Sequence, residues 1–271
     1  MLRDITIGQY FPGNSLLHRL DPRVKVLMTL LYIVAVFIPQ NWAGLSLAIG
    51  FLVLCVLLSR LPLRLIWKSL KPILPIIVFT SILNIFYVSG GVTLVDWGIF
   101  HITTRGLTTA AFIALRIACL IAGSSLMTYT TTPTALTDAL ERLLRPLQLL
   151  HVNVHELSMM MTIALRFIPT LIEETDKIMS AQKARGADLE SGGLVRRAKA
   201  LIPVLIPLFV SSFRRAYELA TAMECRCYHG GKGRTRMKQL HLAARDVWTL
   251  LAGALLIALL ILGNVFLPAS L

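Results

Sequence analysis

Long apolar runs with almost no charge are the feature that most constrains this chain. A helix needs about 20 mostly apolar residues to cross the ~30 Å hydrocarbon core of a bilayer. Five stretches approach or exceed that length: Val26–Trp42, Ala43–Ser59, Pro72–Ser89, Gly106–Thr130 and Val247–Leu271. Charged residues make up 15% of the 271 residues, where a soluble domain carries about 25%. We therefore expect an all-α membrane protein with about five transmembrane helices, which excludes a soluble globular enzyme.

The distribution of basic residues predicts how these spans are oriented. The net charge is +13, and we assign this excess to cytoplasmic loops and lipid headgroups rather than to nucleic acid. Basic residues gather before the first run and between the second and third: Arg3, Arg19, Arg23, Arg60, Arg64, Lys68 and Lys71. The turn at residues 39–42 carries no charge. We therefore expect a multi-pass protein of the cell membrane with its N-terminus in the cytoplasm and, after five spans, its C-terminus outside.

Residues 131–246 form a polar block between the fourth and fifth spans. They hold 17 of the 27 basic and 11 of the 14 acidic residues, so we place them on the cytoplasmic side. Thr132-Pro133 and Asn153 are expected to begin amphipathic helices in this block. Two apolar stretches, 157–165 and 201–213, are short or interrupted by proline, and we do not expect them to cross the membrane. The chain thus divides into residues 1–130 with four spans, the block 131–246, and a last span at 247–271.

An internal repeat appears when the polar block is shifted by 41 residues. The segment 178–186 then superposes on 219–227, and each copy ends in an arginine between two small residues. The first triplet is Ala184-Arg185-Gly186 and the second is Cys225-Arg226-Cys227. The Gly192-Gly193 and Gly230-Gly231 pairs that follow are expected to stop the two helices. We interpret the copies as two equivalent arms, each presenting one arginine to one of two similar partners.

The same shift places acidic residues of one arm opposite basic residues of the other. Glu173 and Glu174 fall opposite Arg214 and Arg215. If the two arms cross, these side chains are expected to form ion pairs across the crossing. Exposed pairs of this kind contribute only ~0–1 kcal/mol each, so their role would be to fix the register.

No catalytic or metal-binding pattern is complete in the sequence. The P-loop pattern G-x-x-x-x-G-K-[ST] is absent, so we expect no ATP binding through a P-loop. Cys225, Cys227 and His229 have the residue types of a soft metal site but lack a second cluster. We therefore expect no cofactor, no bound metal and no enzyme activity.

Several motifs together resemble a known family, over roughly residues 8–236. They are Pro12-Gly13-Asn14-Ser15, the segment His18–Arg23, the segment Leu165–Pro169 and above all Ala184-Arg185-Gly186. These resemble the transmembrane T component of the energy-coupling factor transporters, which take up vitamins and some transition-metal ions. The resemblance implies a non-catalytic scaffold that joins a small substrate-binding membrane subunit to two cytoplasmic ATPases of the ABC type.

The resemblance also implies a role for the two arginine triplets. In this family, such motifs at the ends of long coupling helices dock into grooves of the two ATPases. The first triplet matches the family pattern. The second has Cys225 and Cys227 where alanine and glycine are usual, so the glycine that would end the helix is missing.

Two other functions fit parts of the sequence. Arg116 lies inside an apolar span, where an ionisable residue is a functional candidate by default. It would mark the site of a self-sufficient secondary transporter, although the spans lack matched broken helices in two halves. A weaker alternative is a membrane-bound metal enzyme built on Cys225, Cys227 and His229.

Overall fold

The computed structural model describes residues 10–88, 90, 93–97, 100–150, 152–188, 193–230 and 241–266. The chain separates into two compact units, and each is described by itself. We call them the bundle unit, made of residues 8–139 and 239–271, and the arm unit, built around residues 140–238.

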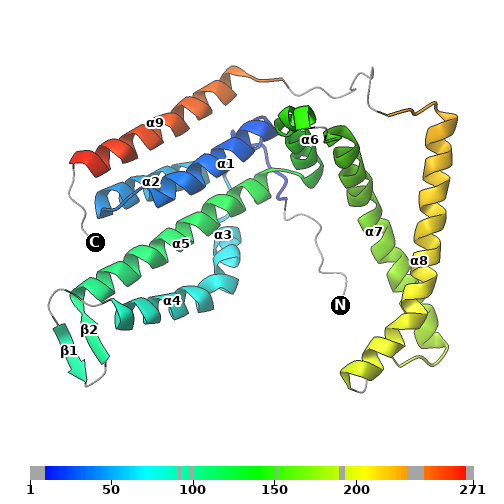
Figure 1. The fold of residues 1–271 in the computed structure, drawn as a ribbon, viewed down its shortest axis with the longest axis horizontal. Coiled ribbons are helices and arrows are strands. Elements are labelled where there is room, and N and C mark those ends of the chain that lie inside the picture. The colour runs from blue at the N-terminus through cyan, green and yellow to red at the C-terminus, as the bar shows by residue number, and fades with distance from the viewer. Residues whose placement is uncertain are drawn as a thin grey trace. The chain divides into compact units, whose positions relative to one another are not determined.

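The elements of the bundle unit follow in chain order (Figure 1). They are α1 (Pro22–Phe37), α2 (Trp42–Ser59), α3 (Leu63–Leu70), the 3₁₀ turn η2 (Lys71–Ile73), α4 (Leu74–Tyr87), β1 (Thr93–Trp97), β2 (Phe100–Thr103), α5 (Thr104–Thr130) and α9 (Ala244–Phe266). Helix α6 (Pro133–Leu143) leads out of this unit. The arm unit continues with the 3₁₀ turn η3 (Arg145–Leu150), α7 (Val154–Ala184) and α8 (Leu194–Cys225).

Among the described residues, five helices are long and apolar enough to cross a membrane. They are Trp42–Ser59, Leu63–Tyr87, Thr104–Thr130, Val195–Cys225 and Ala244–Phe266. The prediction of an all-α membrane protein with about five spans is thus confirmed, although the set of helices differs. Helix α1 has only 16 residues and is not among the five, whereas α8 is.

The α1–α2 hairpin lies where the sequence predicts it. The Asn41 side chain accepts a hydrogen bond from the Gly44 N–H at 2.8 Å and so caps α2. Helix α9 ends beside this turn, where the Asn264 amide donates to the Ile38 carbonyl at 2.6 Å. The turn therefore ties three helices together at one end.

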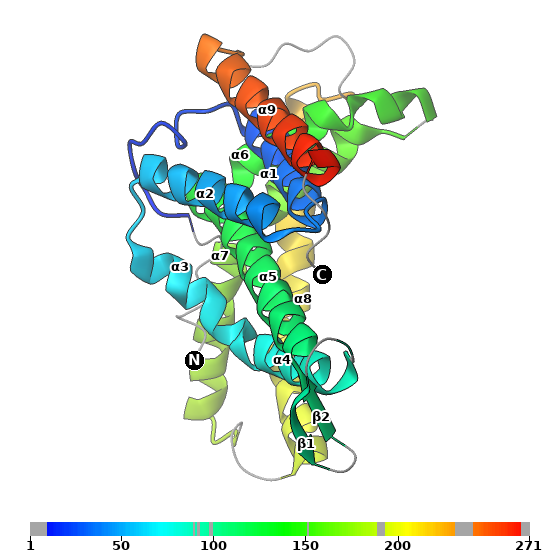
Figure 2. The same cartoon turned by 90° about the vertical axis from the view of Figure 1, so that its left-hand side faces the viewer.

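The region between the second and third runs is helical rather than a simple loop, which corrects one expectation. Residues 63–70 form α3, with Lys68 in its last turn. Pro72 and Pro75 have no N–H to donate to the carbonyls of Lys68 and Lys71. The helix consequently tightens into η2 and restarts as α4, which packs along α5 (Figure 2).

The connection between α4 and α5 also contains regular secondary structure that the sequence did not lead us to expect. Strands β1 and β2 pair antiparallel, with Val95 opposite Ile102 and Trp97 opposite Phe100. A register shift between Thr93 and Val95 interrupts the ladder. This short hairpin leads into α5, whose first turn is capped by the Thr103 hydroxyl.

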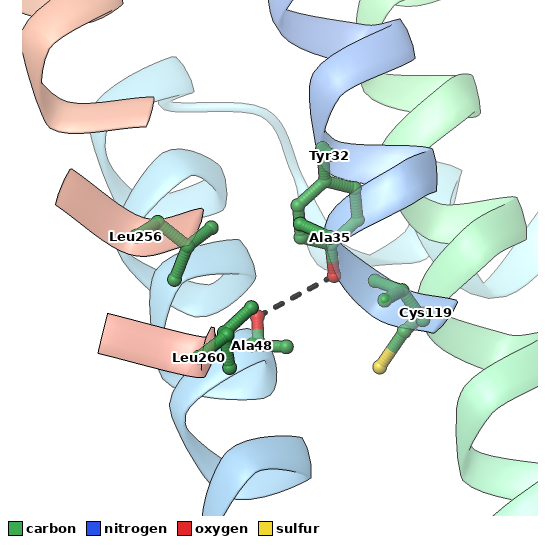
Figure 3. Close-up of a cluster of buried hydrophobic side chains, with 7 residues drawn as sticks. Tyr32, Ala35, Ala48, Cys119, Leu256 and Leu260 are labelled. Carbon is green, nitrogen blue, oxygen red and sulfur yellow. Dashed lines mark hydrogen bonds between the residues drawn. The ribbon is translucent and has the colours of Figure 1, made fainter. Parts of the chain in front are cut away.

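The core of the bundle unit lies where α1, α2, α5 and α9 meet. Figure 3 shows its buried side chains, which include Tyr32, Ala35, Ala48, Cys119, Leu256 and Leu260. The Tyr32 hydroxyl donates to the Ala48 carbonyl at 3.4 Å. A Cβ at Gly123 would lie 2.5 Å from the Tyr32 ring, so only glycine permits this approach of α5 to α1.

Buried charges join the other ends of these helices. The Lys25 amine donates to the Thr130 carbonyl at the end of α5, at 2.8 Å. Asp21 caps α1, and its own N–H donates to Asp246 Oδ1 at the start of α9, at 2.9 Å. Since Lys25 also donates to the His18 carbonyl, the His18–Arg23 motif of the sequence serves to hold the bundle together.

Candidate functional site

Helices α7 and α8 are both much longer than the apolar patterns suggested. They have 31 and 32 residues, and they continue through Pro169, Pro203 and Pro207. The apolar stretches 157–165 and 201–213 are therefore parts of two longer, continuous helices. A proline inside a helix leaves the carbonyl four residues earlier without its donor, and the structure shows how one of these gaps is filled.

The filled gap lies at the carbonyl of Pro203, whose normal donor would be the missing N–H of Pro207. The Gln182 side-chain amide of α7 donates to this carbonyl at 3.3 Å. The two helices run antiparallel where they meet and cross near this contact (Figure 1). A backbone acceptor freed by proline thus fixes where α7 crosses α8.

Helix α7 ends in a Schellman motif at the first arginine triplet. The Ala187 N–H donates to the Gln182 carbonyl at 2.9 Å, and the Gly186 N–H donates to the Lys183 carbonyl at 3.0 Å. Gly186 has a φ of 87°, a left-handed conformation that glycine adopts without strain. Arg185 occupies the C-cap position.

Helix α8 ends in the same way at the second triplet. The Tyr228 N–H donates to the Met223 carbonyl at 3.0 Å, and the Cys227 N–H donates to the Glu224 carbonyl at 2.8 Å. Cys227 takes the left-handed position with a φ of 56°, and Arg226 is the C-cap. The missing glycine therefore does not change the backbone at this end.

The helix ends differ from the expectation that the two Gly-Gly pairs stop the helices. Helix α7 ends before Gly186, and Gly193 is the N-cap of α8 rather than a stop. Gly230 follows the end of α8 with a φ of 95°. Gly192 and Gly231 lie outside the described residues.

Both arginine triplets are exposed at the surface of the arm unit. This holds for Ala184, Arg185 and Gly186 and equally for Cys225, Arg226 and Cys227. Within the part of the chain that the structure describes, neither arginine pairs with an acidic side chain. Each helix end thus presents an exposed guanidinium that can bind an external carboxylate.

The two arginines are well separated along the arms. Arg185 lies three residues beyond Gln182, close to the crossing, whereas Arg226 lies at the far end of α8. At a rise of 1.5 Å per residue, the stretch of α8 from Pro203 to Arg226 spans roughly 35 Å. One small groove cannot contact both.

An ion pair holds the two arms together between these ends. Arg215 Nη2 of α8 lies 3.1 Å from Glu174 Oε2 of α7. The side chains of both residues are partly exposed. Glu173 and Arg214 are exposed, and neither forms an ion pair with another described residue.

Another contact in the arm unit had no signal in the sequence. Glu141 of α6 receives hydrogen bonds from two residues of α7, with His155 Nδ1 at 3.0 Å and Ser158 Oγ at 2.7 Å. These partners are 14 and 17 residues away. Helical periodicity relates neighbours three or four residues apart, so it does not reveal a contact across a corner.

Arg116 has structural partners in the bundle unit. Its Nη2 donates to the Pro39 carbonyl in the α1–α2 turn at 2.6 Å. Its guanidinium also lies over the ring of Phe112, 4.7 Å from the centroid, and over that of Phe37. Through these contacts, the Arg116 guanidinium links α5 to the α1–α2 hairpin. Because these contacts account for the charge inside the span, that charge no longer indicates a transport site.

The two thiols of the second triplet are the basis of the metal-enzyme alternative. Cys225 and Cys227 are free and exposed. Among the described residues, no group of three or more His, Cys, Asp or Glu side chains is arranged to hold a metal ion. The described geometry therefore lends this alternative no support.

Comparisons with known proteins agree with these features. The family model described as cobalt transport protein, CbiQ, matches residues 13–238. The energy-coupling factor transporter transmembrane protein EcfT of Clostridium kluyveri is 53% identical over 267 residues, which cover 98% of this chain and 99% of the relative. That of Ruminiclostridium cellulolyticum is 56% identical over 247 residues, 91% of this chain and 92% of the relative. The chain therefore belongs to the CbiQ family of transmembrane transport proteins, together with the EcfT proteins of energy-coupling factor transporters.

Proposed function

We propose that the chain is the coupling scaffold of an ATP-driven energy-coupling factor importer of a micronutrient, a vitamin or a metal ion. In this role it links a small substrate-binding membrane subunit to two cytoplasmic ABC-type ATPases. The chain itself hydrolyses no ATP, and no nucleic acid takes part.

The observation that carries the proposal is the repetition of one local structure at two distant places. Both long helices of the arm unit end in a Schellman motif with an exposed arginine at the C-cap. Arg226 lies roughly 35 Å along α8 from Pro203, which is close to Arg185, and two equivalent features at such distant places suit two separate but similar subunits. Residues 184–186 and 225–227 are the docking residues in this proposal.

Arginine suits a contact that transmits motion. Its planar guanidinium stays charged and binds a carboxylate through two parallel hydrogen bonds, which fixes direction as well as distance. The small residues on either side allow the side chain to enter a groove. Movement of an ATPase would therefore pull or rotate the end of a rigid helix without slipping.

The middle of α8 supports a contact with the substrate-binding membrane subunit. Its apolar side chains Ile202, Ile206, Phe209 and Phe213 are exposed, the last of them by 72%. An exposed apolar helix of this length is unfavourable in water and indicates a hydrophobic partner. We assign this surface to the substrate-binding membrane subunit.

The proposed orientation follows from the basic loops. Residues 1–130 would hold four spans with the N-terminus in the cytoplasm, residues 131–246 the cytoplasmic coupling helices, and residues 247–271 the last span leading outside. In this assignment α1 crosses within the bundle, and α8 lies on the cytoplasmic side. A topology reporter fused after Leu271 should report outside, and one at Gly193 inside.

Charge reversal at the helix ends tests the docking role. Removing one partner of a buried charge pair typically costs ~2–5 kcal/mol, so Arg185→Glu and Arg226→Glu should each strongly weaken copurification of an ATPase. The double variant should lose both ATPases and transport while the spans stay inserted. Arg197→Glu is the matched control, because Arg197 is an exposed arginine of α8 outside both triplets. Normal transport by the double variant would refute the proposal.

A further inference from the structure

A cavity of about 180 Å³, partly open to the outside, lies between α1, α2, α5 and α9 of the bundle unit. Its wall is mostly apolar and includes Phe51, Leu52, Cys55, Leu126 and Met127. Apolar cavities of about 150 Å³ in protein cores stay dry and admit small hydrocarbons. The size and lining therefore favour a hydrocarbon occupant over water.

The few polar groups in the wall already have partners inside the bundle. The hydroxyls of Thr29, Thr130 and Thr249 donate to the carbonyls of their own helices at 2.8 Å. Lys25 donates to two backbone carbonyls. A polar ligand would find few groups to bond, which leaves an alkyl chain as the suitable occupant.

The cavity is accessible from the lipid side of α2. Leu54 and Leu58 line it and are 52% and 40% exposed, so the cavity opens beside this helix. In a bilayer this surface faces acyl chains, so a chain can enter sideways between these leucines without crossing water.

Positive charge follows immediately after this entrance. Arg60 caps the end of α2, two residues beyond Leu58, and is exposed. Arg64 and Lys68 are exposed in the first and second turns of α3. Cations at the membrane surface attract anionic headgroups, so the entrance distinguishes anionic from zwitterionic lipids.

We propose that this cavity binds one acyl chain of an anionic phospholipid, whose headgroup lies at Arg60. The lipid would fill the space between the four helices and stabilise the bundle. This inference concerns the bundle unit alone and stands independently of the docking role of the two arginines.

Native mass spectrometry of the full chain, purified from its membrane in mild detergent, tests the proposal. The wild-type chain should retain one phospholipid that survives extensive washing. Cys55→Phe fills the cavity and should lower this occupancy at least ten-fold. Val53→Phe is the matched control, because Val53 lies two residues away on α2, is 50% exposed and does not line the cavity. Met127→Trp fills the cavity from α5 and serves if Cys55→Phe does not fold.

The choice of lipid is tested by adding back a defined probe. Delipidated wild-type chain should bind palmitoyl-oleoyl phosphatidylglycerol at least five-fold more tightly than the matching phosphatidylcholine, and Arg60→Gln should remove this preference. Equal lipid retention by a folded cavity-filling variant would overturn the proposed site. Equal binding of the two lipids by the wild-type chain would overturn the anionic headgroup.

Discussion

Gly186 and Cys227 occupy the same position in two Schellman motifs, with left-handed φ angles of 87° and 56°. Glycine adopts this conformation freely, whereas a residue with a Cβ loses roughly 1–2 kcal/mol in it. The two arm ends therefore share one geometry but differ in how firmly it is held. We expect the end at Arg226 to open more readily than the end at Arg185.

Substitutions at these two positions should change the stability of the two helix ends in opposite directions. Cys227→Gly should slow amide exchange at residues 227 and 228 roughly five-fold, because about 1 kcal/mol of backbone strain is removed. Gly186→Ala should accelerate exchange at residues 186 and 187 by a similar factor. Hydrogen exchange with mass spectrometry measures both ends in one sample. Unchanged amide exchange in both variants would show that the residue in the left-handed position does not determine how readily either helix end opens.

The sequence predicts the local features of this fold well. Helices begin directly after the predicted N-caps Thr132 and Asn153, and the Thr132 hydroxyl accepts from the Ala135 N–H, although the Asn153 side chain makes no capping hydrogen bond. The α1–α2 turn and the span of α5 depend likewise on neighbouring residues. Such features are decided within one or two turns of the chain, so composition and spacing are sufficient.

The features that the sequence does not reveal depend on distant residues. In the sequence, Pro203 and Pro207 indicate an interrupted helix. In the structure, the Gln182 side-chain amide, 21 residues from Pro203, donates to the Pro203 carbonyl in place of the N–H that Pro207 lacks. Glu141 likewise reaches His155 across a corner. At the end of α8, the Gly-Gly pair is a stronger local signal than Cys227, yet the helix ends at Cys225 and Cys227 takes the left-handed position after it. In each case, tertiary or cap geometry overrides the preference of single residues.

The Gln182–Pro203 contact gives a prediction with its own internal control. Gln182→Leu should lower the stability of the arm unit by about 1 kcal/mol, because the Pro203 carbonyl loses its donor. In a Pro207→Ala background the restored backbone N–H at position 207 bonds this carbonyl, so Gln182→Leu should cost much less there. Thermal unfolding of the four purified chains measures the difference. Equal losses in both backgrounds would mean that the hydrogen bond does not hold the crossing.

The Glu174–Arg215 pair should fix the register of the two arms. Because both side chains are partly exposed, the pair contributes only ~0–1 kcal/mol. Glu174→Arg should reduce recovery of the assembled complex, and Arg215→Glu in the same chain should restore part of it. Glu173→Arg is the control, since Glu173 is exposed and has no ion-pair partner among the described residues. Absence of rescue in the double reversal would exclude the register role.

Arg116 should matter for stability rather than for transport chemistry. Arg116→Met strands the Pro39 carbonyl and loses the contact with Phe112, which should lower stability by about 2 kcal/mol. A variant chain that remains folded should still support transport when the ATPases are present. Loss of transport by well-folded Arg116→Met chains would restore the alternative of a substrate site in α5.

Photo-crosslinking from the two arm ends is the most direct test of a scaffold that binds two ATPases. A photoreactive residue at Ala184 or at Cys225 stands at the equivalent last helical position, directly before Arg185 or Arg226. In the assembled complex, each position should crosslink to one ATPase subunit, and both together should yield one chain joined to two ATPases. Crosslinking of both positions to a single ATPase molecule, or of neither to any ATPase, would contradict the coupling scaffold.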